Sequence, residues 1–214
     1  SAAASEWYKR QDRDLLVWIL AWTARSLVLA PLELFNANIF HPAPGALASS
    51  EHLIGMAPLA TPIWFATRNP VLTYNLTVLG VSMITAFTLW LAVMEEEKLP
   101  VAAFVVAALF AFDPSVSLGW VRLHESAIWL FPLVLLLALR LARKPSGPGF
   151  AILVLVTAIQ FLAGAYLTFL LAVFLAAVSP ALVLEARRNG RSGLLPLLAL
   201  ACGALLAAPS ALPY

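Results

Sequence analysis

The stretch GFAILVLVTAIQFLAGAYLTFLLAVFLAAVSPALVL, residues 149–184, contains no charged side chain. A helix that crosses the hydrocarbon core of a bilayer, about 30 Å thick, needs roughly 20 apolar residues. The stretch is therefore too long for a single crossing. Gly164 lies near its middle, where a glycine permits a tight reversal of the chain. The stretch predicts two antiparallel membrane-spanning helices, over 149–163 and 165–184.

The whole chain has the composition of an integral membrane protein. Of its 214 residues, 62% are hydrophobic and 11% are charged. A soluble domain carries about 25% charged residues, so this supply cannot cover a water-exposed surface. No basic run interleaved with exposed aromatic residues is present, and we expect no nucleic-acid partner. The composition predicts an all-α, polytopic membrane helix bundle.

Other apolar segments bring the expected number of transmembrane helices to about six, and they cover residues 71–93, 99–112, 124–142 and 192–209. Two further apolar stretches, 15–34 and 51–67, are ambiguous. A lone Arg25 at mid-bilayer would cost about 2.5–3.5 kcal/mol, and Pro58 and Pro62 interrupt the second stretch. We expect both stretches to lie at the membrane interface, with an ordinary first span over 15–34 as the alternative.

The positions of the basic residues predict the orientation. Arg140, Arg143 and Lys144 form one cluster, and residues 187–191 contain another. Two predicted spans separate the clusters, so both lie on the same side, which the positive-inside rule assigns to the cytoplasm. The acidic turn at residues 95–98 then lies there too. Residues 1–70 become an extracytoplasmic loop with interfacial helices, followed by a transmembrane bundle over 71–214.

In this topology most polar side chains that are suited to chemistry lie on the outer side. They are Asp12, His41, Glu51, His52, Asp113, Arg122, His124 and Glu125. We expect them to line a shared polar cavity, although ordinary loop polarity is the alternative for each one. Arg122 suits a phosphate group, which it can bind through two parallel N–H bonds, or it anchors the chain at the interface.

Metal binding is an open alternative at the same loop. His41, Glu51 and His52 offer ligands for a divalent cation, but they lack the helical His/Glu spacing of the known zinc motifs. We therefore assign no metal ligands and no certain cofactor. Ser49 or Ser50 is expected to cap a helix that begins at Glu51.

Several segments together resemble large bacterial membrane proteins of the GT-C glycosyltransferase superfamily, which includes protein O-mannosyltransferases and the aminoarabinose transferases of lipid A. The segments are DRDLLVWILAW (12–22), LFNANIFHP (34–42), SEHL (50–53), NPVLTYNL (69–76), FAFDP (110–114), RLH (122–124) and WLFP (129–132). The resemblance implies a multi-pass protein of the bacterial cytoplasmic (inner) membrane. It also implies a first outer loop that carries a catalytic carboxylate, and a polyprenyl-phosphate-linked sugar as the donor.

Roles for two residues follow from the resemblance. Asp12 aligns with the family's carboxylate and would deprotonate the acceptor hydroxyl, while Arg122 would offset the charge on the departing lipid phosphate. Asp14 is instead expected to be the N-cap of a helix that begins at Leu15.

The sequence also departs from the family. The helix before the outer loop, the later spans and a soluble C-terminal domain are absent, and we expect the chain to be a fragment of a longer polypeptide. Residues 95–97 are acidic where the family's turn is usually basic. The alternative function is a catalytically inactive scaffold, or an accessory subunit that associates with other membrane proteins.

Overall fold

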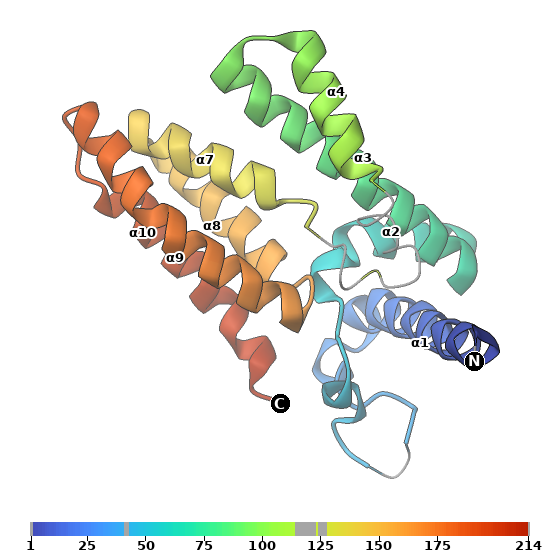
Figure 1. Ribbon diagram of the computed structural model, residues 1–214. Helices are drawn as coiled ribbons and strands as arrows, with labels where there is room; N and C mark the ends of the chain where they lie inside the picture. The colour runs from blue at the N-terminus through green and yellow to red at the C-terminus, as the bar shows by residue number, and fades with distance from the viewer. Residues whose placement is uncertain (1, 41–42, 114–122, 124–127, 214) are drawn as a thin grey trace.

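Every regular element in the described part of the computed structural model, residues 2–40, 43–113, 123 and 128–213, is a helix (Figure 1). The all-α prediction is therefore confirmed for these residues. The elements in chain order are α1 (Ala2–Leu29), η1 (Pro31–Glu33), η2 (Ala46–Ser49), η3 (Ile54–Met56), α2 (Ala57–Thr67), α3 (Pro70–Glu97), α4 (Pro100–Ala111), α7 (Phe131–Arg143), α8 (Gly147–Phe161), α9 (Ala165–Arg188), α10 (Leu194–Ala207) and η5 (Ala208–Ala211).

The uncharged stretch breaks where the sequence predicts it. Helix α8 ends at Phe161 and α9 begins at Ala165. Gly164 has a φ of 174°, which is extended backbone that any residue adopts, so the reversal does not depend on a left-handed glycine. At the other end of α8, the side chain of Ser146 accepts a hydrogen bond of 3.1 Å from the N–H of Gly149 and caps the helix.

Three helices are long and apolar enough to cross a membrane, and they cover Pro70–Glu97, Tyr166–Arg188 and Leu194–Ala211. Large apolar side chains point away from the protein, with Phe169 67% and Leu205 70% exposed. Surfaces of this kind are stable against lipid and not against water. These helices indicate a membrane protein.

The other predicted spans are shorter in the structure. Helix α4 has 12 residues and α8 has 15, and at 1.5 Å per residue they are about 18 Å and 22 Å long. Helix α7 begins at Phe131, and residues 124–127 of the predicted span lie outside the described part. The length criterion thus supports three spans among the described residues rather than six.

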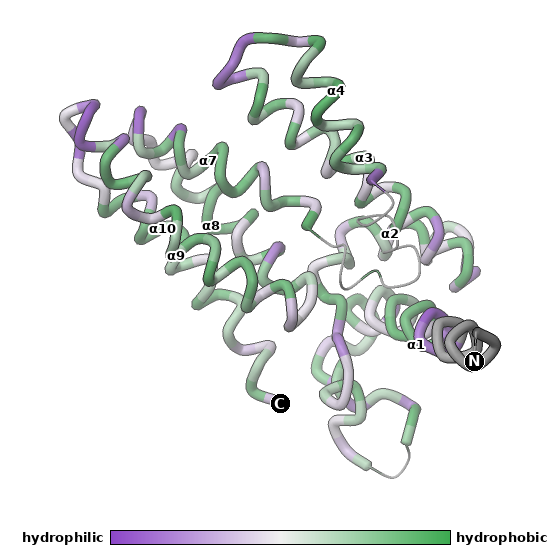
Figure 2. The backbone as a smooth tube through the Cα atoms, in the orientation of Figure 1, coloured by the Kyte–Doolittle hydropathy of each residue, from purple (hydrophilic) through white to green (hydrophobic). Residues whose placement is uncertain are grey.

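Ion pairs tie together one end of the bundle, where Figure 2 shows hydrophilic turns at the ends of α3, α7 and α9. Arg140 pairs with Glu95, and Arg143 pairs with both Glu96, at 2.6 Å, and Glu185, at 2.8 Å. The prediction that the acidic turn and both basic clusters lie on the same side is confirmed. The pairs also explain why acidic residues occur on a basic face, since they neutralise arginines of neighbouring helices.

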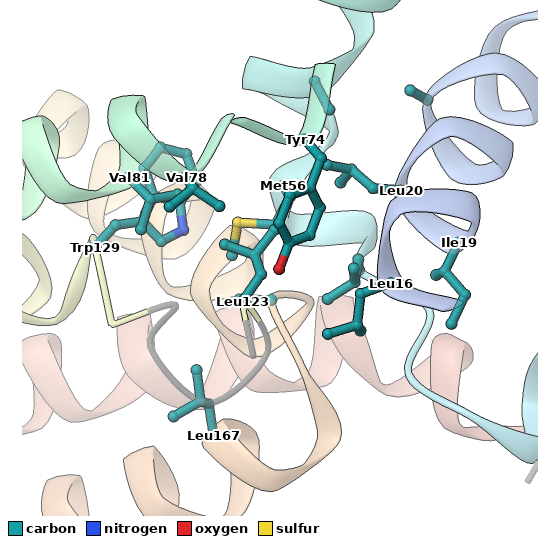
Figure 3. Packing of buried hydrophobic residues seen from close by; sticks show 14 of the residues in the cluster. Leu16, Ile19, Leu20, Met56, Tyr74, Val78, Val81, Leu123, Trp129 and Leu167 are labelled. Carbon is teal, nitrogen blue, oxygen red and sulfur yellow. The ribbon is translucent and has the colours of Figure 1, made fainter. Parts of the chain in front are cut away.

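Two apolar clusters fill the interior. One cluster joins α7, α8, α9 and α10 through residues such as Leu141, Leu153 and Leu171. The other lies toward the opposite end of α3 and combines α1, η3 and α2 with the first half of α3 (Figure 3). Leu123 is completely buried in this second cluster. The N-terminal segment (residues 1–70) and the bundle therefore share a core.

Two expectations about the N-terminal segment are wrong. Helix α1 begins at Ala2, well before Asp14, so Asp14 is inside a helix and is not an N-cap. No helix begins at Glu51, because Leu53 has a left-handed φ of 50° and α2 starts only at Ala57. Ser49 ends η2 and Ser50 follows it, so neither serine caps the next helix.

Candidate functional site

Asp12 lies on the side of α1 that faces the rest of the protein. On a helix, residues three or four apart share a face, which groups Asp12 with Leu16 and Ile19. Leu16 and Ile19 are 4% and 0% exposed, whereas Asp12 itself is exposed at the end of this face. Asp14 shares a face with Trp18 and is 74% exposed. Asp12 and Asp14 are two residues apart, so they lie on different faces of α1.

Tyr74 connects this face of α1 to the segment before α7. Its ring is buried at 1% exposure, and its hydroxyl is hydrogen-bonded to the backbone of Leu123. Figure 3 shows the hydroxyl oxygen of Tyr74 directed toward Leu123, with Leu16 and Leu20 of α1 close by. Leu123 therefore packs against α1 and α3 at the end of the molecule where Asp12 lies.

His52 is a buried side chain rather than an open ligand. It is 4% exposed, its ring meets the ring of Phe35 edge-on at 6.1 Å, and its Nδ1 accepts a hydrogen bond from the N–H of Ile54. Thr23 of α1 donates a hydrogen bond of 2.7 Å to its carbonyl oxygen. Burial lowers the pKa of His52 to about 4, because the charged imidazolium would lose its hydration.

An apolar cavity of about 510 Å³ lies beside His52. Phe161 and Thr168 form one wall where α8 turns into α9, and alanines of α10 and η5 form the other. Thr168 donates a hydrogen bond of 2.9 Å to the carbonyl of Gly164, so its hydroxyl is used locally. The lining suits an apolar group or a neighbouring helix better than a sugar.

A second cavity, of about 270 Å³, lies between α1, Asn38 and the junction of α2 with α3. We call it the tryptophan cavity, because Trp18, Trp22 and Trp64 line it together with Asp14, Val17, Ala21, Arg25, Asn38 and Pro70. The rings of Trp18 and Trp22 are stacked with centroids 5.9 Å apart. The sequence analysis did not predict this cavity. A signal for it was present, because the spacing of Asp14, Trp18, Trp22 and Arg25 places these residues along one face of a helix.

The remaining site predictions are tested less directly. Glu51 is half-buried and Asp113 is exposed, while His41, Arg122, His124 and Glu125 lie outside the described residues. That Glu51, His52 and His124 line one shared cavity therefore stays a prediction. Leu53 and Met56 do share one buried cluster with Leu123. Among the described residues, no group of three or more metal-ligating side chains comes together.

Buried polar contacts that sequence reasoning missed hold the segment before α7 in place. The N–H of Leu130 donates a hydrogen bond of 2.9 Å to the side-chain oxygen of Gln160. Thr88 donates one of 3.1 Å to the carbonyl oxygen of Trp129. A glutamine inside an apolar helix is a signal for such a contact, because a buried amide needs a partner. The contacts fix the chain at Trp129 and Leu130, just after residues 124–127, which lie outside the described part.

No known protein family, no curated protein and no solved structure matches the chain.

Proposed function

We propose that the chain is a GT-C-type membrane glycosyltransferase that moves a sugar from a polyprenyl-phosphate donor to an acceptor hydroxyl at the extracytoplasmic face. The observation that carries the proposal is that Leu16 of α1 and Leu123 lie in the same buried cluster. Asp12 continues the face of Leu16, and Leu16 shares a buried cluster with Leu123, the residue between Arg122 and His124 in the sequence. This supports a site to which Asp12 and the 122–125 segment both contribute.

The chemistry needs few groups. Asp12 is exposed enough to meet a substrate, and as a carboxylate it would accept the proton of the attacking hydroxyl. The bond between the sugar and the phosphate breaks as the new glycosidic bond forms, and the lipid phosphate leaves with the electron pair. A phosphate leaves without a strong general acid, so the cation of Arg122 would suffice to stabilise its charge.

A test uses the 214-residue chain reconstituted with a panel of radiolabelled polyprenyl-phosphate monosaccharides and a membrane extract as the acceptor. We expect transfer by the wild type, and a loss of about 100-fold or more in Asp12→Asn, the usual effect of removing a general base. Glu97→Gln is the matched control, since Glu97 is an exposed acid at the far end of α3. Equal transfer by Asp12→Asn and wild type would contradict the assignment of Asp12.

The second candidate is an inactive scaffold or accessory subunit, and the wall of the apolar cavity favours it. Ala204, Ala207, Ala208 and Ala211 of α10 and η5 line that cavity. Small residues allow close approach of another membrane helix. Absence of transfer from every donor, together with recovery of the chain in a stable complex with other membrane proteins, would favour this candidate.

A further inference from the structure

Three hydrogen-bond donors around the tryptophan cavity have no partner among the residues that the structure describes. Arg25 is exposed and forms no ion pair with any described residue, and the side-chain amide of Asn38 is also unbonded within that part of the chain. The indole Nε1 of Trp64 is buried without an acceptor among the described residues. In contrast, Trp22 already donates to the carbonyl of Leu34, at 2.8 Å.

The electrostatics of the cavity favour an anion. Asp14 lies at one end of it, but Asp14 is within 3.7 Å of Arg13, which offsets its charge. Arg25 lies three turns further along α1, about 16 Å away at 1.5 Å per residue. The guanidinium of Arg25 therefore carries the unbalanced charge, and its planar fork of N–H groups fits a phosphate.

The walls of the cavity favour a ligand that is also partly apolar. The stacked rings of Trp18 and Trp22 form one wall, and Trp64 of α2 contributes a third indole. Indole rings are amphipathic and are enriched at the headgroup level of bilayers. A free phosphate ion has no apolar part to contact these rings, whereas a lipid headgroup continues into glycerol and acyl chains.

The length of α3 places the cavity at the depth of the lipid phosphates. Pro70 lines the cavity and Glu95 belongs to the ion-paired end, and both lie in α3. Twenty-five residues of helix separate them, about 38 Å. A bilayer has about 30 Å of hydrocarbon and about 40–45 Å with its headgroup regions. If the ion pairs lie at one headgroup layer, the cavity lies at the other.

We propose that the tryptophan cavity binds the phosphodiester headgroup of a bilayer glycerophospholipid, with Arg25 holding the phosphate and Asn38 and Trp64 donating to its oxygens. The bound lipid would fix α1 against the membrane surface at the end of the bundle where Asp12 lies. The proposal is independent of sugar transfer, since it needs neither a sugar donor nor catalysis.

The test measures lipid binding to the purified 214-residue chain by native mass spectrometry in a phosphate-free detergent. The probes are dioleoylphosphatidylglycerol, dioleoylglycerol, which has the same chains without phosphate, and inorganic phosphate. We expect tight binding of the phospholipid alone. Arg25→Gln should weaken it about tenfold or more, as expected for the loss of a charged hydrogen-bonded pair.

Arg191→Gln is the matched control, because Arg191 is an exposed arginine at the ion-paired end and the variant makes the same charge change. Its affinity should stay within about twofold of wild type. Arg25→Lys keeps the charge but loses the two-pronged geometry, and should bind with intermediate affinity. Circular dichroism checks that each variant is folded.

Three results would overturn the proposal. Equal affinity of Arg25→Gln and wild type would show that Arg25 does not hold the phosphate. Equal binding of dioleoylglycerol and the phospholipid would show a purely apolar groove. Displacement of the phospholipid by millimolar inorganic phosphate would show a site for a soluble anion.

Discussion

At Gly55 the backbone of the N-terminal segment contacts the backbone of the helix bundle, and replacing Gly55 with alanine should destabilise the protein. The N–H of Gly55 donates a hydrogen bond of 2.6 Å to the carbonyl oxygen of Leu162, in the turn between α8 and α9. A Cβ atom at position 55 would lie 2.3 Å from the carbonyl oxygen of Ile159 and 2.4 Å from the backbone nitrogen of Ala163. Backbone atoms cannot rotate away, so the loop or the turn must move.

The expected cost follows from two contributions. Forcing an extra methyl group into a packed interior costs about 1–3 kcal/mol. Separating the two backbones also weakens a buried hydrogen bond, and an unsatisfied group costs about 1–3 kcal/mol. We expect Gly55→Ala to lower the free energy of unfolding by about 3 kcal/mol or more. For a chain of this size that corresponds to a fall in Tm of about 6–12 °C.

Gly80→Ala provides the control. A Cβ at Gly80 would meet only the Cδ1 of Leu59, at 3.6 Å, which is ordinary van der Waals contact. Gly80 is inside α3, where alanine favours the helix by about 0.5–1 kcal/mol. The assay is thermal unfolding in detergent, followed by circular dichroism. A Tm for Gly55→Ala within about 2 °C of that for Gly80→Ala would refute the close contact.

Two further predictions concern charged groups. Arg143→Ala removes contacts with Glu96 and Glu185 and should lower the free energy of unfolding by about 1–2 kcal/mol, and by less in high salt. The control Arg191→Ala should change that free energy by less than about 0.5 kcal/mol. Equal effects of the two variants would contradict the ion-pair network. The pKa of His52 is about 4 in the folded protein and 6.5 in the unfolded chain. Between these pH values the unfolded chain binds more protons than the folded protein. The free energy of unfolding therefore falls as the pH drops through this window. From about pH 8 to pH 5 we expect the free energy of unfolding of the wild type to fall by about 2 kcal/mol, and this fall should be missing in His52→Gln. If His52→Gln keeps the pH profile of the wild type, His52 is not the group responsible.

The apolar pattern predicts the bundle because each membrane-spanning helix must by itself contain about 20 apolar residues, which are visible in the local sequence. The break at residues 163–165 follows from the length of the uncharged stretch. Most of α3 follows from the apolar run over 71–93. The partners within the polar end do not follow, since Glu96 and Glu185 meet Arg143 from helices far apart in the sequence. The distribution of basic residues places these side chains on the same side of the membrane, but it does not predict which of them form ion pairs.

The N-terminal segment is predicted less well, for two physical reasons. Asp14 stands directly before the apolar run of residues 15–20, which predicted a helix start there. However, Ala2–Gln11 are mostly good helix formers and extend α1 to Ala2. The burial of His52 and the close fit of Gly55 depend on the α8–α9 turn, more than a hundred residues away. Such long-range packing leaves no local pattern. The candidate site is therefore predicted in its residue types but not in its geometry.

Cysteine accessibility in right-side-out bacterial vesicles tests the topology most directly. With the exposed Cys202 replaced by alanine, single cysteines at Ser49, Ser146 and Asn189 sample the outer loop and two turns at the ion-paired end. We expect a membrane-impermeant maleimide to label position 49 and to leave positions 146 and 189 unlabelled until the membrane is permeabilised. Labelling of position 189 from outside while position 49 is protected would reverse the orientation and place Asp12 in the cytoplasm, where the proposed donor site cannot be.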